Sequence, residues 1–227
     1  MGSFVDMKAR DGFAVPAYVA QPAGRPRGGV VVLQEIFGVN AHIRNVADAY
    51  ASQGYLAVAP ATFQRVKPDV DLGYGEEDRN QGMALKAAVQ ALPAPGVLQD
   101  IQSAIDHAAQ AGKVGIVGFC WGGLLAWQAA CELQGLSAGV AYYGGGTTTP
   151  EEVKRRPKVP VLAHYADQDR WIWQDSVEAF RKAHPEVQVH VYHADHGFNC
   201  DHRGAYDEQA ASLARERTLA FLAEHLA

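Results

Sequence analysis

The chain has 227 residues, of which 48% are hydrophobic, and its formal net charge is −5 at pH 7. This length and composition allow one substantial core, so we expect a single domain over residues 1–227. The acidic balance and the lack of a long basic run argue against nucleic-acid binding, and no apolar stretch reaches the roughly 18–20 residues of a membrane span.

The three cysteines, Cys120, Cys131 and Cys200, are odd in number and widely spaced. They predict neither a disulfide framework nor a zinc motif, and they suit a reducing compartment. The N-terminal stretch MGSFVDMKARDGF lacks the basic-then-apolar layout of a signal peptide, so we expect a cytoplasmic protein.

The predicted elements begin with a β-hairpin, because two alternating apolar runs within residues 4–20 flank Asp11-Gly12. The continuous apolar run 28–34 predicts a buried strand, and the next helix should begin after Asn40 and stop at Gly54. Residues 60–76 look irregular. Further strands are expected at 55–60, 113–119, 138–144, 159–165 and 187–193, and further helices at 77–92, 97–111, 121–133, 175–185 and 206–226, with one short helix between the strands at 138–144 and 159–165.

Strands and helices alternate through this series. The alternation predicts an α/β fold with a mostly parallel central sheet and helices on both faces. In such sheets, binding and catalytic sites form at the carboxyl ends of the strands. Reactive residues that directly follow a strand are therefore the first candidates for a functional site.

The stretch VGIVGFCWGG, residues 114–123, places Cys120 in a tight turn between a strand and a helix. Gly118 and Gly122 remove side chains that would clash in such a turn. The helix N-terminus favours thiolate over thiol, and the thiolate is the nucleophilic species. The pattern predicts a nucleophile for covalent catalysis; a buried structural cysteine is the alternative.

A cysteine nucleophile needs a base, and His196 is the best-placed histidine because it follows the last strand and precedes the closing helix. His190 and His193 lie on or beside that strand and are interpreted as strand-face residues. The stretch HVYHADH faintly resembles a metallo-hydrolase motif, but Val191 stands where the first ligand histidine is required. We therefore expect no metal site there.

The base needs an orienting carboxylate, and the segment HYADQDRW supplies both Asp167 and Asp169 after a strand. The chain order nucleophile, acid, histidine is that of the α/β-hydrolases. An oxyanion needs backbone donors, and we expect them to be the N–H groups of Trp121 and of Ile36 in the loop QEIFGVN.

The chain resembles the dienelactone hydrolase family, the carboxymethylenebutenolidases, within the α/β-hydrolases. The resemblance is carried by VVVLQEIFGVNAHIRNVADAYASQGYLAVAP, VGFCWGG, HYADQDRWI and HGFNCDHRGAYDEQAA. It implies a triad of Cys120, Asp169 and His196. In the family, the acid of the triad lies three residues after a glycine. Ala166 stands at the position of that glycine here, so the same count selects Asp169 over Asp167.

The resemblance also implies that Glu35 partners the resting thiol and moves when substrate arrives. A carboxylate beside a thiol opposes thiolate formation, although Glu35 could instead be a loop residue paired with an arginine. The family substrate is a carboxylated enol lactone, for which Arg79 and Arg203 are candidate ligands, each with a surface role as its alternative. Aromatic residues that could shape a pocket or simply pack are Phe37, Phe63, Tyr74, Trp121, Trp171, Trp173 and Phe198.

The resulting hypothesis is a hydrolase that opens a dienelactone to maleylacetate through a Cys120 thioester, with no metal or organic cofactor. We expect a small-molecule substrate, no membrane partner, and a monomer or weak homo-oligomer. One alternative is an esterase or thioesterase of the same fold with another acyl substrate. A second alternative is a non-catalytic redox or binding protein that uses the Cys120 thiol, with Cys200 as the candidate thiol to approach it in space.

Overall fold

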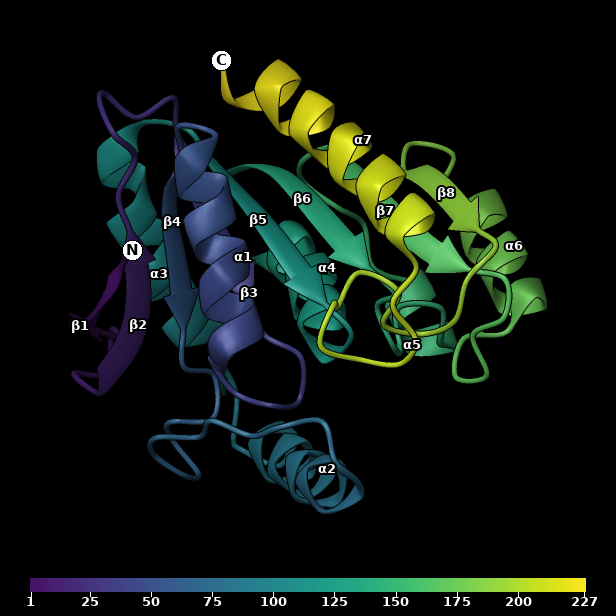
Figure 1. Cartoon of the computed structure of the whole chain (residues 1–227), viewed down its shortest axis with the longest axis horizontal. Helices are drawn as coiled ribbons and strands as arrows, with labels where there is room; N and C mark the ends of the chain where they lie inside the picture. Colours follow the sequence, from purple (N-terminus) through teal and green to yellow (C-terminus); the bar gives the residue numbers. More distant parts are fainter.

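The computed structural model describes all 227 residues, and its strands form one eight-stranded sheet (Figure 1). The strand order is β1-β2-β4-β3-β5-β6-β7-β8. The β1–β2 and β2–β4 pairs are antiparallel and every other pair is parallel. The strands are β1 Ser3–Lys8, β2 Ala14–Ala20, β3 Gly29–Leu33, β4 Leu56–Pro60, β5 Val114–Phe119, β6 Leu136–Tyr142, β7 Val161–Ala166 and β8 Gln188–Tyr192.

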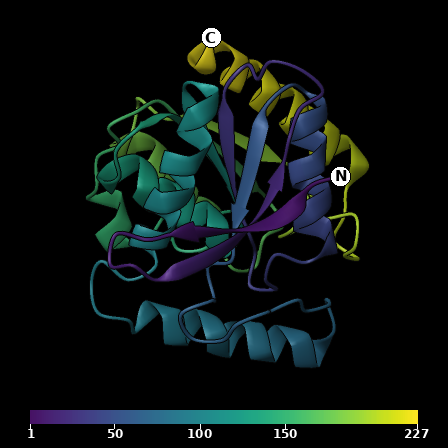
Figure 2. The ribbon, with the colours of Figure 1, turned by 90° about the vertical axis from the view of Figure 1, so that its left-hand side faces the viewer.

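Helices cover both faces of the sheet (Figures 1 and 2). They are α1 Ala41–Ser52, α2 Glu76–Gln90, α3 Leu98–Ala108, α4 Trp121–Glu132, α5 Pro150–Val153, α6 Gln174–Ala183 and α7 Glu208–Leu226. Helices α1 and α7 pack on one face, whereas α3, α4 and α6 lie on the other. This arrangement confirms the predicted α/β-hydrolase architecture and its N-terminal hairpin. None of the helices is both long and apolar enough to cross a lipid bilayer.

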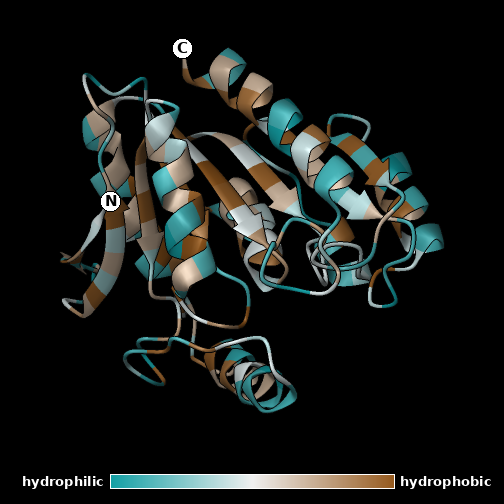
Figure 3. Cartoon of the chain, in the orientation of Figure 1, coloured by the Kyte–Doolittle hydropathy of each residue, from teal (hydrophilic) through white to brown (hydrophobic).

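The central strands are hydrophobic along their whole length because helices cover both of their faces. Every residue of β3, β4 and β5 is buried. Figure 3 shows this contrast between the brown and white central strands and the more hydrophilic α6. The rigid sheet therefore fixes the positions of the loops at its carboxyl edge.

Helix α1 begins where the sequence predicts. The side chain of Asn40 caps it by accepting a hydrogen bond from the backbone N–H of Ile43 at 3.2 Å. The helix ends at Ser52, and Gly54 follows in the left-handed region with φ of 92°. The capped N-terminus of α1 thus holds the loop between β3 and α1 against the carboxyl edge of the sheet.

Helix α2 differs from the others because it does not cover a face of the sheet. It lies across the carboxyl ends of the strands, as Figure 2 shows from the side. The irregular segment after β4 leads into it, and Pro93 and Pro95 separate it from α3. The excursion between β4 and α3 thus forms part of the surroundings of this edge.

Candidate active site

Cys120 lies at the turn between β5 and α4 with φ of 55° and ψ of −116°. A positive φ is sterically unfavourable for a residue with a side chain and is typical of positions held for function. A Cβ atom on Gly118 would lie 1.9 Å from the carbonyl oxygen of Gly122, and one on Gly122 would lie 2.4 Å from that of Gln34. The two glycines therefore make the turn possible, as the sequence pattern predicts.

The structure brings Cys120, His196 and Asp169 together in one chain of contacts. The Nε2 atom of His196 lies 3.1 Å from the Cys120 sulfur, and its Nδ1 atom lies 2.6 Å from Oδ2 of Asp169. The other Asp169 oxygen accepts hydrogen bonds from the backbone N–H groups of Trp171 and Ile172. These bonds fix the carboxylate, which in turn fixes the imidazole.

Asp167, the other acid considered, lies outside this chain of contacts. Its carboxylate contacts Nδ1 of His193 at 3.0 Å, and His193 is exposed. The three histidines of HVYHADH therefore have different neighbours, because His190 lies on β8 beside His164 while His196 contacts Cys120. They do not converge on one point.

The charge state of His196 follows from its partners. Burial alone lowers the pKa of this histidine, but the negative charge on Cys120 and the hydrogen bond to Asp169 raise it to about 10. The imidazolium is therefore the favoured form near neutral pH. A buried imidazolium beside sulfur is the arrangement that stabilises a thiolate.

The expected oxyanion donors belong to two segments that pack against each other at the turn. Trp121 is the first residue of α4, where the backbone N–H has no acceptor in a preceding helical turn. Ile36 lies in the loop after β3, is buried, and its N–H donates to no backbone or side-chain acceptor. Both amides are thus available as donors.

Glycine at position 82 allows α2 to lie directly on this loop. A Cβ atom there would be 2.2 Å from the carbonyl oxygen of Ile36. The neighbouring segment also holds the loop, since Leu72 N–H donates to the Phe37 carbonyl and the Asn40 side chain donates to that of Leu72. The excursion between β4 and α3 therefore restrains the loop that carries Ile36.

Glu35 pairs with an arginine and not with Cys120. Its Oε1 atom accepts a hydrogen bond from Nη1 of Arg203 at 2.9 Å, while Oε2 is buried and has no partner. The Arg203 guanidinium packs over Gly197, where a Cβ atom would lie 2.4 Å from Nη1. The structure thus places Arg203 beside Gly197, the residue that follows His196, and gives Glu35 the ion pair that the sequence left as an alternative.

The other predicted substrate contacts have different surroundings. Arg79 is exposed on the first turn of α2, and its side chain makes no hydrogen bond or ion pair. Phe37 is buried with its ring 4.6 Å from that of Tyr74, and Trp121 is buried in a stack on Phe63 at 5.1 Å. The Phe37 and Trp121 rings are therefore both buried in aromatic packing.

Tyr143 is a neighbour of the site that sequence reasoning missed. It directly follows β6 with φ of 36°, and its ring lies 5.1 Å from that of His196. Its hydroxyl group is buried without a hydrogen-bond partner. The sequence signal was its place after a strand, in AYYGGG, but nothing there distinguishes Tyr143 from Tyr142.

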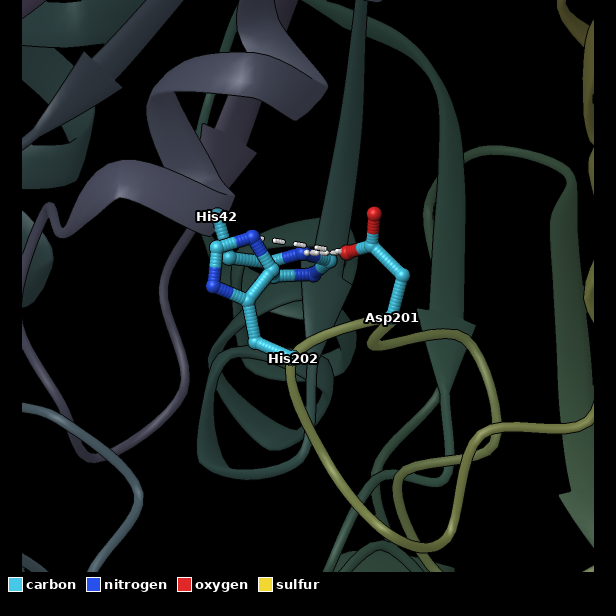
Figure 4. A group of neighbouring side chains, drawn as sticks. All are labelled: His42, Asp201 and His202. Carbon is cyan, nitrogen blue, oxygen red and sulfur yellow. Dashed lines mark hydrogen bonds and ion pairs between the residues drawn. The ribbon is translucent and has the colours of Figure 1, made fainter.

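One group of side chains has the composition of a metal site. His42 at the start of α1 lies beside Asp201 and His202, which belong to the loop before α7 (Figure 4). Potential ligand atoms of the three residues all lie within 4.8 Å of one another. This group is separate from Cys120, His196 and Asp169.

Comparison with known proteins gives one consistent family. The sequence model of the dienelactone hydrolase family matches residues 15–226. The carboxymethylenebutenolidase of Pseudomonas putida is 35% identical over 229 residues, which cover 96% of this chain and 95% of that protein. The carboxymethylenebutenolidase of Pseudomonas knackmussii has the same identity and coverage.

Solved structures give the same result for the fold. The crystal structure of a Klebsiella pneumoniae protein assigned to the dienelactone hydrolases superimposes with a TM-score of 0.84 at 32% identity, covering 99% of this chain and 98% of that one. A dienelactone hydrolase-like promiscuous phosphotriesterase from metagenomic libraries superimposes with a TM-score of 0.76 at 22% identity, covering 99% of this chain and 98% of that one. The second likeness concerns the fold alone.

Proposed function

The chain belongs to the dienelactone hydrolase family and is a carboxylic ester hydrolase, and from this premise we propose that it opens a small carboxylated enol lactone through a Cys120 thioester. The observation that carries the mechanism is the continuous contact from Cys120 through His196 to Asp169. The contact of His196 with the Cys120 sulfur and the position of Cys120 at the N-terminus of α4 both favour a thiolate at position 120.

In the proposed reaction, the Cys120 thiolate attacks the lactone carbonyl carbon and forms a carbon–sulfur bond. The backbone N–H groups of Trp121 and Ile36 stabilise the negative charge that develops on the carbonyl oxygen. The ring carbon–oxygen bond then breaks, and its electron pair leaves as an enolate within the opened acyl chain. An enolate is a good leaving group, so this step needs little protonation.

Water completes the cycle by cleaving the thioester. The released enolate first takes the proton of the His196 imidazolium and becomes an enol; the neutral imidazole, held in orientation by Asp169, then accepts a proton from the attacking water. The carbon–sulfur bond breaks, Cys120 regains its negative charge, and the acyl group leaves as a carboxylate. With a dienelactone as substrate, the released enol becomes the ketone of maleylacetate.

The substrate carboxylate is proposed to interact with arginine. Arg203 lies beside Gly197, which follows His196 in the chain, and its planar guanidinium can hold a carboxylate by two hydrogen bonds. It is already paired with Glu35, so substrate binding would compete with or extend that pair. Arg79 is a second candidate, on a helix that packs against the Ile36 loop.

The proposal is tested by measuring hydrolysis of cis- and trans-dienelactone alongside uncharged p-nitrophenyl esters. We expect the highest kcat/KM for a dienelactone. A marked preference for esters without a carboxylate would instead favour an esterase or thioesterase with another acyl substrate. Such a result would remove the basis for the proposed arginine contacts.

A redox function of Cys120 receives less support. All three cysteines are free thiols, and Cys200, the candidate resolving thiol, is buried. Burial and the charge of Glu35 raise the pKa of Cys200 to about 12, which leaves little of the reactive thiolate. A disulfide between Cys120 and Cys200 under mild oxidation, without ester turnover, would favour the redox alternative.

A further inference from the structure

We propose that His42, Asp201 and His202 form a binding site for a divalent transition-metal ion, of which Zn²⁺ matches the ligand set best. The site lies outside the proposed catalytic residues, and the proposal does not depend on the ester substrate. Two imidazoles and one carboxylate are ligands that zinc commonly takes in proteins, with water completing the coordination shell.

The geometry supports this assignment. Asp201 Oδ1 lies 3.1 Å from Nδ1 of His42 and 3.7 Å from Nε2 of His202. Both imidazole rings are directed toward the same carboxylate oxygen from different elements (Figure 4). Ligands at about 2 Å from a tetrahedral metal are separated by little more than 3 Å, so small side-chain movements would complete the site.

His42 is the residue that distinguishes this group from an ordinary exposed cluster. It is only 4% exposed, with Nδ1 directed at Asp201, so one ligand is held in place by the core. Burial favours the neutral imidazole, which is the form that coordinates a metal. Asp201 and His202 remain exposed and can adjust around an incoming ion.

Two orphaned polar atoms also fit a metal at this position. Coordination through Nδ1 would leave the proton of His42 on Nε2, which is buried without a partner. The Oε2 atom of Glu35 is likewise buried and unpartnered, and the Glu35 carboxylate lies close enough for its charge to act on His42. Carboxylates commonly hold the second nitrogen of a metal-bound histidine, often through a water molecule, and Glu35 and His42 share no direct hydrogen bond here.

The position of the site suggests access for the ion and an effect on the protein. His42 and Asp201 line a cavity of about 350 Å³ between α1 and α7. A bound ion would join α1 to the loop that carries Arg203, next to the Arg203–Glu35 pair. We therefore expect metal binding to stabilise this loop.

The test is a Zn²⁺ titration by isothermal calorimetry, together with thermal unfolding with and without Zn²⁺. It uses Cys120→Ala protein because a thiolate beside His196 can itself bind zinc. We expect one Zn²⁺ per chain and a rise in Tm, since a ligand that binds only the folded state stabilises it.

The exposed ligands then provide the decisive variants, because replacing them leaves the core unchanged. In the Cys120→Ala background, His202→Ala and Asp201→Asn should each weaken Zn²⁺ binding by about tenfold or more and abolish the rise in Tm. His193→Ala is the matched control, since it removes an exposed histidine that contacts another aspartate. Absence of stoichiometric binding, or equal affinity in the His202→Ala and His193→Ala proteins, would overturn the proposal.

Discussion

The carboxylate of Asp169 lies 2.6 Å from Nδ1 of His196, and this contact selects between the two acids that follow β7. We predict that Asp169→Asn lowers kcat by about 10³-fold or more, because asparagine can present its N–H₂ group and favour the wrong tautomer of His196. Asp167→Asn is the matched control, and its exposed contact with His193 is worth little. Equal activities of the two variants in a steady-state ester assay would exclude the assigned role of Asp169.

The pH dependence of Cys120 alkylation should reflect the charge of His196. Since the pKa of His196 is raised to about 10, the imidazolium persists through neutral pH and loses its proton as the pH rises through that value. The charge of His196 therefore stabilises the folded protein fully below the pKa of free histidine, about 6.5, and this stabilisation is lost as the pH rises toward 10. We expect the rate of Cys120 alkylation by iodoacetamide, plotted against pH, to change a second time at high pH, and this high-pH limb should lie near the same value.

In the Asp169→Asn protein, the same limb should shift to lower pH. The negative charge of Asp169 stabilises the imidazolium, so its removal lowers the pKa of His196. The measurement is the alkylation rate from pH 6 to about 11, with free cysteine as the reference for the reagent. An unchanged limb in the variant would show that Asp169 does not control the charge of His196.

Gly82→Ala should reduce catalysis while leaving the thiolate intact. Alanine in a helix interior is ordinarily favourable by about 1 kcal/mol, but here its Cβ atom would meet the Ile36 carbonyl oxygen at 2.2 Å. Displacing the Ile36 N–H should lower kcat by about tenfold or more, because an oxyanion donor is lost or misplaced. Alkylation of Cys120 forms no oxyanion, so the rate of that reaction should not change.

Met83→Ala is the control for the Gly82 prediction, because Met83 is the exposed neighbour on the same helix. A Gly82→Ala enzyme with full kcat would show that the contact between α2 and the Ile36 loop has no part in catalysis. Loss of alkylation together with kcat would instead indicate general damage to the site.

Arg203→Ala should affect both stability and substrate binding. It leaves the Glu35 carboxylate buried without its cation, which typically costs about 3–5 kcal/mol. We expect the double variant Glu35→Gln/Arg203→Ala to recover stability in urea unfolding while KM for a dienelactone stays raised by about tenfold or more. Recovery of KM in the double variant would contradict a substrate contact by Arg203.

Arg79→Ala provides the comparison for that experiment. Arg79 is exposed and unpaired, so its loss should leave the free energy of unfolding unchanged. A raised KM for dienelactone but not for uncharged esters would assign it to substrate binding as well.

The sequence predicted most of the fold and the central contacts of the site, for physical reasons that can be identified. Buried parallel strands are continuous apolar runs, and the Gly118 and Gly122 pattern marks a turn that few sequences can form. Chain order separated His196 from the other histidines. The choice of Asp169 depended on the family resemblance, because spacing alone leaves both aspartates at the end of the same strand.

The features of the site that could not be predicted from the sequence depend on contacts between segments that lie far apart along the chain. The pairing of Glu35 with Arg203 joins residues 168 positions apart, and the packing of Gly82 on Ile36 joins two separate excursions. The arrangement of His42 with Asp201 likewise needs the loop before α7 to reach α1. None of these contacts leaves a local pattern of spacing or composition.

The most direct test of the central claim is the rate of dienelactone ring opening by wild-type and Cys120→Ser protein, followed by the loss of the ring's ultraviolet absorbance. The account predicts turnover by the wild type and a loss of about 10³-fold or more in the variant, because a serine hydroxyl does not form the anionic nucleophile that a thiol forms beside the His196 imidazolium. Equal rates of ring opening by the two proteins would contradict the role assigned to the Cys120 thiolate.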